Sequence, residues 1–371
     1  MDFKDLKSLK IGDLTARLPI IQGGMGIGIS LSGLASAVAN EGGIGIIATA
    51  GIGMSEPDFY TNYLEANLRA LRKEIRRARE LSKGILGVNI MVALTNFADL
   101  VKTAIEEKID IIFSGAGLPL NLPQFITEGI KTKIVPIVSS GRAASIIAKK
   151  WTEKYNYLPD AIVVEGPKAG GHLGFKQEML TDPEHALEKL IPEVIEAVKP
   201  YEKQYGKPIP VIAAGGIYTG ADILKFFQLG ASGVQMATRF VTTYECDASD
   251  KFKQTYIDSK KEDMVIIKSP VGLPGRVINN KFVEKIKQGK TIPFKCSYKC
   301  LRTCEPDKAP YCIAKVLSNA SRGKLDESFV FAGSNAYKCK EIIPVKTLVD
   351  KLKAELASAL ASTQTAAVNQ K

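Results

Sequence analysis

A histidine among glycines is the residue with the clearest chemistry in this chain. The motif Glu165-Gly-Pro-Lys-Ala-Gly-Gly-His-Leu-Gly174 follows an apolar run that predicts a buried strand at 161–165. Glycine has no Cβ, so the backbone of this motif can lie close against a flat ligand. His172 is one of two histidines, and an imidazole can carry a proton near neutral pH. We interpret His172 as a catalytic residue; a purely structural histidine is the alternative.

Phosphate chemistry is indicated further along the chain. Gly215 and Gly216 follow the seventh predicted strand, and Thr238 follows the eighth. In α/β barrels, the loops at these two places often bind a phosphate. A helix predicted to begin near Thr219-Gly220 would turn its positive N-terminal end toward the anion. Ordinary turn glycines are the alternative. The spacing Gly23-x-x-Gly26-x-Gly28 is only a weak dinucleotide signal, because it departs from the known fingerprint.

Alternating strands and helices must position these residues. Apolar runs alternate with amphipathic patterns, which predicts a parallel α/β architecture. Strands are expected at 18–22, 44–48, 85–90, 110–114, 134–139, 161–165, 210–213 and 233–236. Helices are expected at 31–41, 60–81, 97–107, 122–130, 143–155, 183–198 and 221–229. His185 falls near the start of one of these helices and is expected on its surface. Eight such units favour a closed (β/α)₈ TIM barrel over an open doubly wound sheet.

The places of the glycine clusters support the barrel. Nearly every cluster follows the carboxyl end of a predicted strand. In a barrel these ends meet on one face, where such enzymes place their active sites. A single cluster would mark only a tight turn, but corresponding clusters after six strands indicate one shared site.

The regular alternation ends near residue 244. We divide the chain into a barrel at 1–244, a C-terminal lid inserted at 245–344, and a segment at 345–371 with a closing helix at 345–360 and a frayed tail at 361–371. The lid region contains a predicted helix at 247–261 and a turn-rich loop at 269–276. A lid over the barrel mouth would exclude water and shape the substrate pocket.

Four cysteines gather in the lid region. The spacing would place the first three on one face of a helix, and it differs from the pairs of common zinc sites and from the usual ferredoxin spacings. A metal or iron–sulfur site, a structural thiol cluster and redox-active cysteines all remain open. Cys246 and Cys339 are expected to be packing residues. The four clustered residues are Cys296, Cys300, Cys304 and Cys312.

Bulk composition limits the classes of function. The 371 residues carry a net charge of +11, but the lysines are scattered and the densest basic patch, at 69–79, fits the solvated face of a helix. We therefore expect no nucleic-acid partner, and a mild attraction for anionic substrates. No apolar run reaches the length of a membrane span, and the charged start offers no secretory signal. A cytoplasmic location is expected, whereas the oligomeric state is not indicated.

Together, five motifs resemble the nitronate monooxygenase family, formerly called 2-nitropropane dioxygenases. The same superfamily includes FMN-dependent enoyl-acyl-carrier-protein reductases and NAD(P)H:quinone reductases. The resemblance covers about residues 14 to 285 and implies a (β/α)₈ barrel, one non-covalent FMN and a catalytic histidine at His172. The motifs are Gln22-Gly-Gly-Met-Gly26, Gly87-Val-Asn-Ile-Met91, the 165–174 segment, Ala214-Gly-Gly-Ile217 and Gly233-Val-Gln-Met-Ala-Thr238.

The resemblance also implies a set of cofactor-binding residues. Two positions depart from the family pattern: Lys168 stands where relatives often have an acidic residue, and Ala237 stands where a glycine is common. The implied residues are Gly23, Gly24 and Met25 along the isoalloxazine, Asn89 near the ring, Glu165, Gly170 and Gly171 beside the flavin, and Gly215, Gly216, Gln235 and Thr238 around the phosphate.

The activity that the resemblance implies is FMN-dependent oxidation of alkyl nitronates to carbonyl compounds and nitrite, with O2 as the second substrate. The alternative is a reductase that passes hydride from NAD(P)H to an enoyl thioester or a quinone. A flavin- or nucleotide-binding protein without catalytic activity is a third hypothesis.

Overall fold

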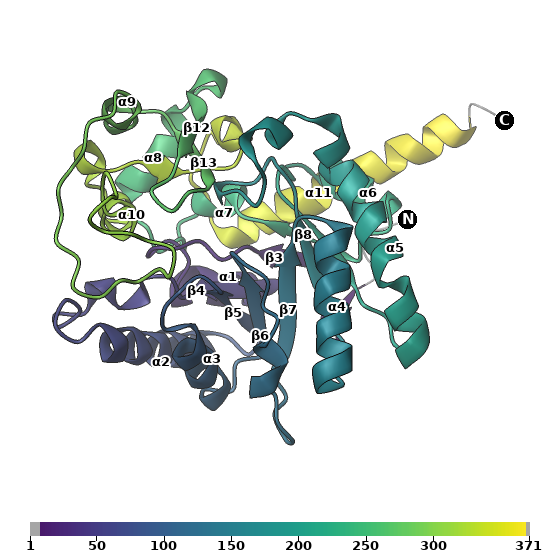
Figure 1. The fold of residues 1–371 in the computed structure, drawn as a ribbon. Coiled ribbons are helices and arrows are strands. Elements are labelled where there is room, and N and C mark those ends of the chain that lie inside the picture. The colour runs from purple at the N-terminus through teal and green to yellow at the C-terminus, as the bar shows by residue number, and fades with distance from the viewer. Residues whose placement is uncertain (1–7, 369–371) are drawn as a thin grey trace.

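The computed structural model describes residues 8–368 and places a parallel barrel at its centre (Figure 1). Eight of the described strands close into this barrel, and each pairs in parallel with its neighbours. The predicted TIM barrel is therefore confirmed. The barrel strands are β3 (Ile20–Gln22), β4 (Ile44–Ala48), β5 (Ile85–Met91), β6 (Ile111–Gly115), β7 (Lys133–Val138), β8 (Ile162–Glu165), β10 (Val211–Ala214) and β11 (Gly233–Met236).

Apolar side chains fill the barrel interior. Ile21, Ile46, Phe113 and Val163 are fully buried there in one cluster. A hairpin of β1 (Leu9–Ile11) and β2 (Leu14–Ala16) adds side chains to the same cluster. The sequence analysis missed this hairpin, because its two strands are only three residues long.

The helices surround the barrel in the order that the sequence predicted, with one exception. Residues 122–130 were expected to form a helix, but only a 3₁₀ turn forms at Leu122–Phe125. The left-handed backbone of Gly129, with φ of 83°, belongs to a turn and interrupts a helical pattern that was already short. The outer helices are α1 (Ser32–Asn40), α2 (Tyr63–Leu81), α3 (Phe97–Glu106), α4 (Gly141–Tyr155), α5 (Leu187–Tyr205), α6 (Gly220–Gln228) and the short α7 (Thr238–Val241).

Helix ends follow local capping rules. At α4, the Ser140 side chain accepts a hydrogen bond from the Ala143 N–H, and Asn156 ends the helix in the left-handed conformation. His185 lies just before α5 in a 3₁₀ turn, where its Nδ1 is 2.9 Å from Asp182 Oδ2. It is therefore near the expected helix start but not on the α-helix itself.

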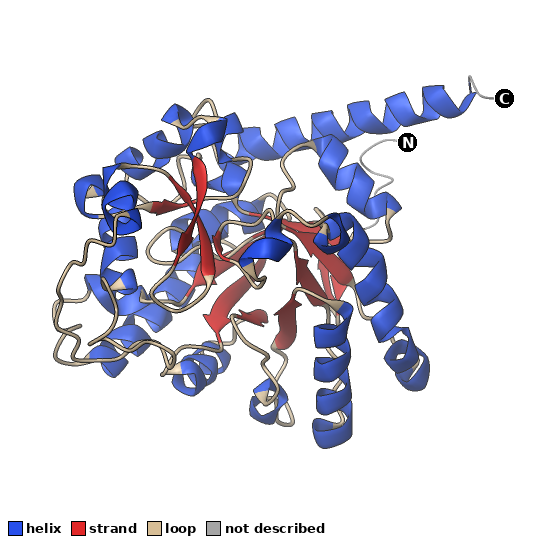
Figure 2. Cartoon of the chain, turned by 45° about the horizontal axis from the view of Figure 1, so that its top comes forward, coloured by secondary structure: helices blue, strands red, loops and turns tan. Residues whose placement is uncertain are grey.

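The lid region, residues 245–344, builds a second, smaller sheet beside the barrel (Figure 2). The loop expected at 269–276 is in part a strand. β12 (Met264–Lys268) and β13 (Pro274–Ile278) form an antiparallel hairpin, and only the turn between them is irregular. β13 also pairs with β9 (Gly171–His172), which comes from the barrel loop after β8. The lid elements are α8 (Asp250–Asp258), β12 (Met264–Lys268), β13 (Pro274–Ile278), α9 (Lys281–Lys287), α10 (Ile313–Ser321) and β14 (Val330–Phe331).

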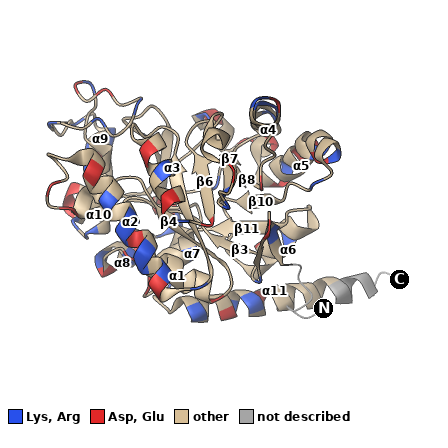
Figure 3. Ribbon diagram, turned by 90° about the horizontal axis from the view of Figure 1, so that it is seen from below, with Lys and Arg blue, Asp and Glu red and all other residues tan. Residues whose placement is uncertain are grey.

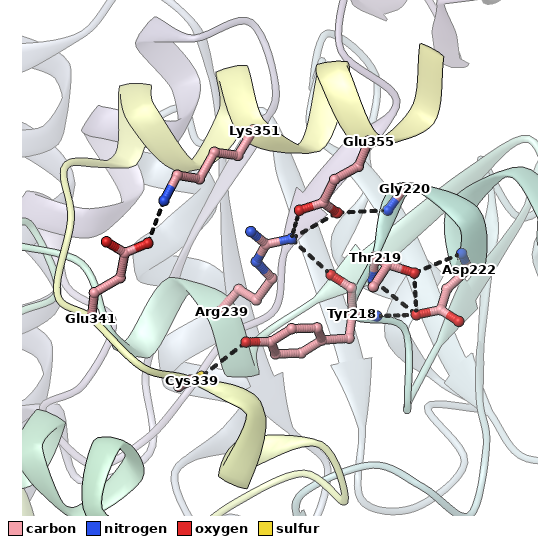
Figure 4. A network of polar contacts seen from close by, with 9 residues as sticks. All are labelled: Tyr218, Thr219, Gly220, Asp222, Arg239, Cys339, Glu341, Lys351 and Glu355. Atoms are coloured by element: carbon pink, nitrogen blue, oxygen red, sulfur yellow. Dashed lines mark hydrogen bonds and ion pairs between the residues drawn. The ribbon is translucent and has the colours of Figure 1, made fainter. Parts of the chain in front are cut away.

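The closing helix α11 (Val345–Val368) continues past its predicted end at residue 360 and packs on α6. Glu355 connects the two helices: its carboxylate accepts from the Gly220 N–H at 2.9 Å and pairs with Arg239 Nη1 at 2.9 Å (Figure 4). The part of the expected tail at 361–368 is thus helical, and residues 369–371 lie outside the described part of the chain.

Charged residues of both signs lie along the outer helices (Figure 3). Within the basic patch on α2, Arg69 pairs with Glu56 and Arg76 pairs with Glu107. Much of this patch is therefore locally neutralised. In the described part of the chain, no helix combines the length and the apolarity that crossing a bilayer requires.

Candidate active site

A cavity of about 540 Å³ opens at the carboxyl ends of the barrel strands and extends under the lid region. It brings together, in one place, every residue that the sequence analysis assigned to the site. Among its described lining residues, the carboxylic acids, lysines and histidines are Glu165, Lys168 and His172. The assigned residues on its wall are Gly23, Gly24, Met25, Asn89, Glu165, Gly170, Gly171, His172, Gly215, Gly216, Gln235 and Thr238.

Glycine is required by close packing on one side of the cavity. A Cβ at Gly24 would lie 2.5 Å from the Asn89 Cβ, and a Cβ at Gly170 would lie 2.6 Å from backbone atoms of Ala332 and Gly333. Gly23 differs, because a Cβ there would meet its nearest neighbour, the Gln235 side chain, at an ordinary 3.4 Å. The open space in front of Gly23 leaves room for a flat ligand.

The predicted phosphate end lies between the barrel and the lid. Gly215 and Gly216 have φ angles of 96° and 84°, which only glycine adopts easily. The Asn335 side chain donates to the Gly216 carbonyl at 2.7 Å, which fixes this turn. A Cβ on the lid residue Gly333 would lie 2.6 Å from Thr238 Oγ1, so the lid backbone runs directly over this threonine.

The start of α6 donates to carboxylates of the protein itself, whereas the sequence-based expectation had it face a bound phosphate. The Thr219 hydroxyl accepts from the Asp222 N–H, and the Asp222 carboxylate accepts from the Thr219 N–H in return (Figure 4). The Gly220 N–H donates to Glu355. Protein groups thus already use the donors at this helix end. Of the phosphate-binding groups that the sequence predicts, the glycine turn and Thr238 line the cavity.

The cavity fits a flavin in its shape and in its free polar groups. Gln235 Oε1 is buried and accepts no hydrogen bond from any described residue. A buried acceptor without a donor is costly, and a flavin N–H or a ribityl hydroxyl could supply one. The glycine-lined wall beside Asn89 and the positive-φ turn at Gly215 and Gly216 fit a flat ring with a phosphate tail.

Glu165 lies at the end of β8 on the cavity wall, and none of the described residues forms an ion pair with it. Burial raises the pKa of its carboxyl from 4.5 to about 7. Near neutral pH a large fraction of this side chain therefore keeps its proton and can donate a hydrogen bond.

His172 is held by the lid rather than by the barrel. Its strand β9 pairs with β13, so that His172 stands opposite Gly275. Its Nε2 lies 2.6 Å from the Ser269 hydroxyl oxygen, and the Phe331 ring packs edge-on at 4.9 Å. Burial lowers the imidazole pKa to about 4, so His172 is uncharged at neutral pH.

Arg276 of β13 ties the histidine loop to the lid. Arg276 is 9% exposed, and its guanidinium donates to the carbonyl oxygens of Pro167 and Ala169. Burial lowers its pKa. The sequence analysis missed Ser269, Arg276 and Asn335, although Ser269 and Arg276 lie in the turn-rich segment that it described.

The cysteine cluster differs from the sequence-based expectation. Its residues lie in irregular chain before α10, so the predicted helix with three cysteines on one face is wrong. Among the described residues, no three His, Cys, Asp or Glu side chains are arranged to hold a metal ion, which leaves the metal reading of these cysteines without geometric support. Cys300 lines the cavity. Burial is the main cause that raises the pKa of its thiol to about 12, and the neighbouring cysteines add to the effect. Cys246 and Cys339 are buried, as packing residues are.

Aromatic rings form the wall of the cavity beside Cys300. The rings of Tyr63 and Tyr298 stack at 4.9 Å, and Phe59 packs against both of them. All three line the cavity, and no charged side chain lies among them. This wall favours an apolar part of a ligand.

A closed parallel barrel with a glycine-lined cavity and an uncharged histidine at its mouth defines an α/β-barrel oxidoreductase that acts on small molecules. Comparison with known proteins specifies the family. The family model described as nitronate monooxygenase matches residues 7–355. A probable nitronate monooxygenase from Staphylococcus aureus is 30% identical over 300 residues, which cover 74% of this chain and 79% of that protein.

Solved structures share the whole architecture. FabK from Thermotoga maritima is 30% identical, with a TM-score of 0.72, and the match covers 94% of this chain and 95% of FabK. Nitroalkane oxidase from Streptomyces ansochromogenes is 23% identical, with a TM-score of 0.71 over 93% of this chain and 97% of that one, and shows likeness of fold. The chain belongs to the nitronate monooxygenase family, whose enzymes are flavin-dependent, and is a nitronate monooxygenase-like oxidoreductase.

Proposed function

We propose that this protein is an FMN-dependent nitronate monooxygenase, which converts alkyl nitronates and O2 into carbonyl compounds and nitrite. The observation that carries the proposal is the uncharged His172 on the wall of a glycine-lined cavity in a member of this family. FMN, when bound, supplies the electron chemistry and the reaction with oxygen.

The cofactor-binding residues divide between the two ends of the cavity. Gly23, Gly24, Met25 and Asn89 would lie along the flavin ring, with Gly170 and Gly171 beside it. Gly215, Gly216 and Thr238 would bind the phosphate. Gln235 Oε1, which has no donor among the described residues, would accept a hydrogen bond from the cofactor. Glu165 in its protonated form would donate one.

His172 would bind the substrate rather than the cofactor. A nitronate is an anion, and a neutral imidazole can donate a hydrogen bond to one of its oxygens. The lid region at 245–344 would keep water out while the substrate reacts, since its segments Ala332–Gly333 and β13 pack on the glycine loop that carries His172.

A reductase is the second candidate, and the likeness to FabK over nearly the whole chain is the observation that favours it. In that case NAD(P)H would deliver hydride to the cofactor, and an enoyl thioester or a quinone would accept it. Lys168, which is exposed and lines the cavity, would suit a phosphorylated ligand.

Anaerobic mixing separates the two candidates. The purified protein is mixed with propyl nitronate and, separately, with NADPH and NADH, while the oxidised flavin absorbance is followed. Fast bleaching by the nitronate alone supports the monooxygenase. Fast bleaching by a nicotinamide, and none by the nitronate, refutes it in favour of the reductase; bleaching by neither leaves a flavin-binding protein without these activities. His172→Ala should lose most turnover and keep its flavin, and normal turnover in that variant would exclude the catalytic role.

A further inference from the structure

The hydrogen bond between His172 and Ser269 joins the histidine loop to the turn of the lid hairpin. Ser269 follows β12 directly and is 3% exposed. Its hydroxyl oxygen is 2.6 Å from His172 Nε2, a distance typical of a strong hydrogen bond. The backbone hydrogen bonds of the surrounding turn do not involve this hydroxyl.

Backbone hydrogen bonds hold the geometry of this turn. The Ser269 N–H donates to the Leu273 carbonyl at 3.0 Å, and the Gly272 N–H donates to the Ser269 carbonyl at 3.0 Å. The Leu173 N–H donates to the Pro274 carbonyl at 2.9 Å, which locks the histidine strand onto the same hairpin. The Ser269 hydroxyl is therefore held in a fixed place relative to the imidazole.

The surroundings of the hydroxyl decide which way the hydrogen bond runs. Besides His172, the described residues give the Ser269 hydroxyl one partner, the Val271 N–H at 3.5 Å, and that group can only donate. The hydroxyl proton therefore has Nε2 of His172 as its acceptor. If Nε2 carried a proton instead, the buried hydroxyl proton would have no acceptor, which is unfavourable.

We propose that Ser269 is a positioning residue that donates to Nε2 and thereby holds His172 as its Nδ1–H tautomer. In an uncharged imidazole one ring nitrogen carries the proton and the other accepts. With Nε2 accepting from Ser269, Nδ1–H is the group left to donate to a ligand. The Phe331 ring, at 4.9 Å, packs against the imidazole and restricts its rotation.

This assignment narrows the substrate, and that step rests on the proposed function. A donor at Nδ1 suits the oxygen of an anionic nitronate. It does not suit a neutral nitroalkane, whose α-proton must be removed by a basic nitrogen with a free lone pair. Nε2 already accepts from Ser269 and Nδ1 carries a proton, so neither ring nitrogen can accept the α-proton. The structure thus favours binding of the preformed nitronate over proton abstraction.

Nitrogen NMR of the flavin-bound protein tests the tautomer directly. With ¹⁵N-labelled histidine the protein gives signals from only two imidazoles, and His185→Gln identifies those of His172. The expected result is a protonated Nδ1 and an unprotonated Nε2 in the parent protein and in Ser269→Thr, which keeps the hydroxyl. Ser269→Ala should lose this preference. A protonated Nε2 in the parent protein, or an unchanged tautomer in Ser269→Ala, would overturn the proposal.

Kinetics supply the second readout. Ser269→Ala should lose about tenfold in kcat/KM for propyl nitronate, the range expected for one misdirected hydrogen bond, and Ser269→Thr should recover most of it. Equal losses in the two variants would contradict the positioning role. The NMR result does not depend on turnover. An absence of nitronate oxidation in the parent protein would refute the proposed function, and the NMR measurement would still decide the tautomer assignment.

Discussion

The buried carboxyl of Glu165 makes the stability of the flavin-free protein depend on pH. Its pKa is 4.5 in a solvated chain and about 7 in the fold. The folded state therefore keeps a proton that the unfolded state has lost, and stability falls as pH rises through this window. Each pKa unit corresponds to about 1.4 kcal/mol, so the full loss amounts to about 3 kcal/mol. Glu165 keeps some surface toward the cavity, and water there makes this figure an upper limit.

Glu165→Gln removes the titration and keeps the shape of the side chain. Denaturant unfolding of both flavin-free proteins at pH 5 and at pH 8 gives the four free energies that are needed. From pH 5 to pH 8, we expect the free energy of unfolding of the variant to rise by up to about 2.5 kcal/mol relative to that of the parent protein. The opposite dependence of His172, whose lowered pKa destabilises the fold as pH falls from 6.5 toward 4, is present in both proteins and cancels in the comparison.

The outcome that refutes this reasoning is a difference between variant and parent that is the same at pH 5 and at pH 8. The carboxyl would then titrate in the fold as it does in water, and its burial would carry no electrostatic cost. A protonated Glu165 could not then be part of the cofactor site near neutral pH.

Three further predictions concern packing and hydrogen bonding. Gly24→Ala should destabilise the flavin-free protein by about 1–3 kcal/mol and abolish flavin binding, because its Cβ would overlap Asn89; Gly23→Ala, the matched control, should impair flavin binding with little change in unfolding. Arg276→Lys should speed amide hydrogen exchange in the loop after β8, since two carbonyl groups lose donors; unchanged exchange there would contradict this role. Glu355→Gln should lower the free energy of unfolding by about 1–3 kcal/mol while flavin affinity stays the same, and a large loss of affinity would show that α11 supports the site.

Much of the fold could be predicted because the barrel follows from local pattern. Every barrel strand was placed within a few residues, since runs such as 44–48 are apolar throughout. The segment 122–130 failed because its short apolar pattern did not reveal the turn that Gly129 makes. The strands of the lid were missed because each is short and gains its stability from pairing with partners far away in sequence, as β13 does with β9.

Part of the candidate site could likewise be predicted from the sequence, and part could not. Glycines at strand ends and the one histidine among them could be recognised from sequence, and the structure places them in a single cavity. Ser269, Arg276 and Asn335 could not be connected to that cavity, because nothing local indicates that a hairpin some hundred residues later docks on the histidine loop.

The sequence by itself determined the strand order, the glycine clusters and the histidine that we propose as catalytic, because each depends on neighbours within one βα unit. Only the tertiary structure decided the ionisation of Glu165 and His172, the hydrogen-bond partner of the imidazole and the use of the α6 terminus by Glu355. These properties depend on burial and on partners brought together by the fold, and a linear pattern contains neither.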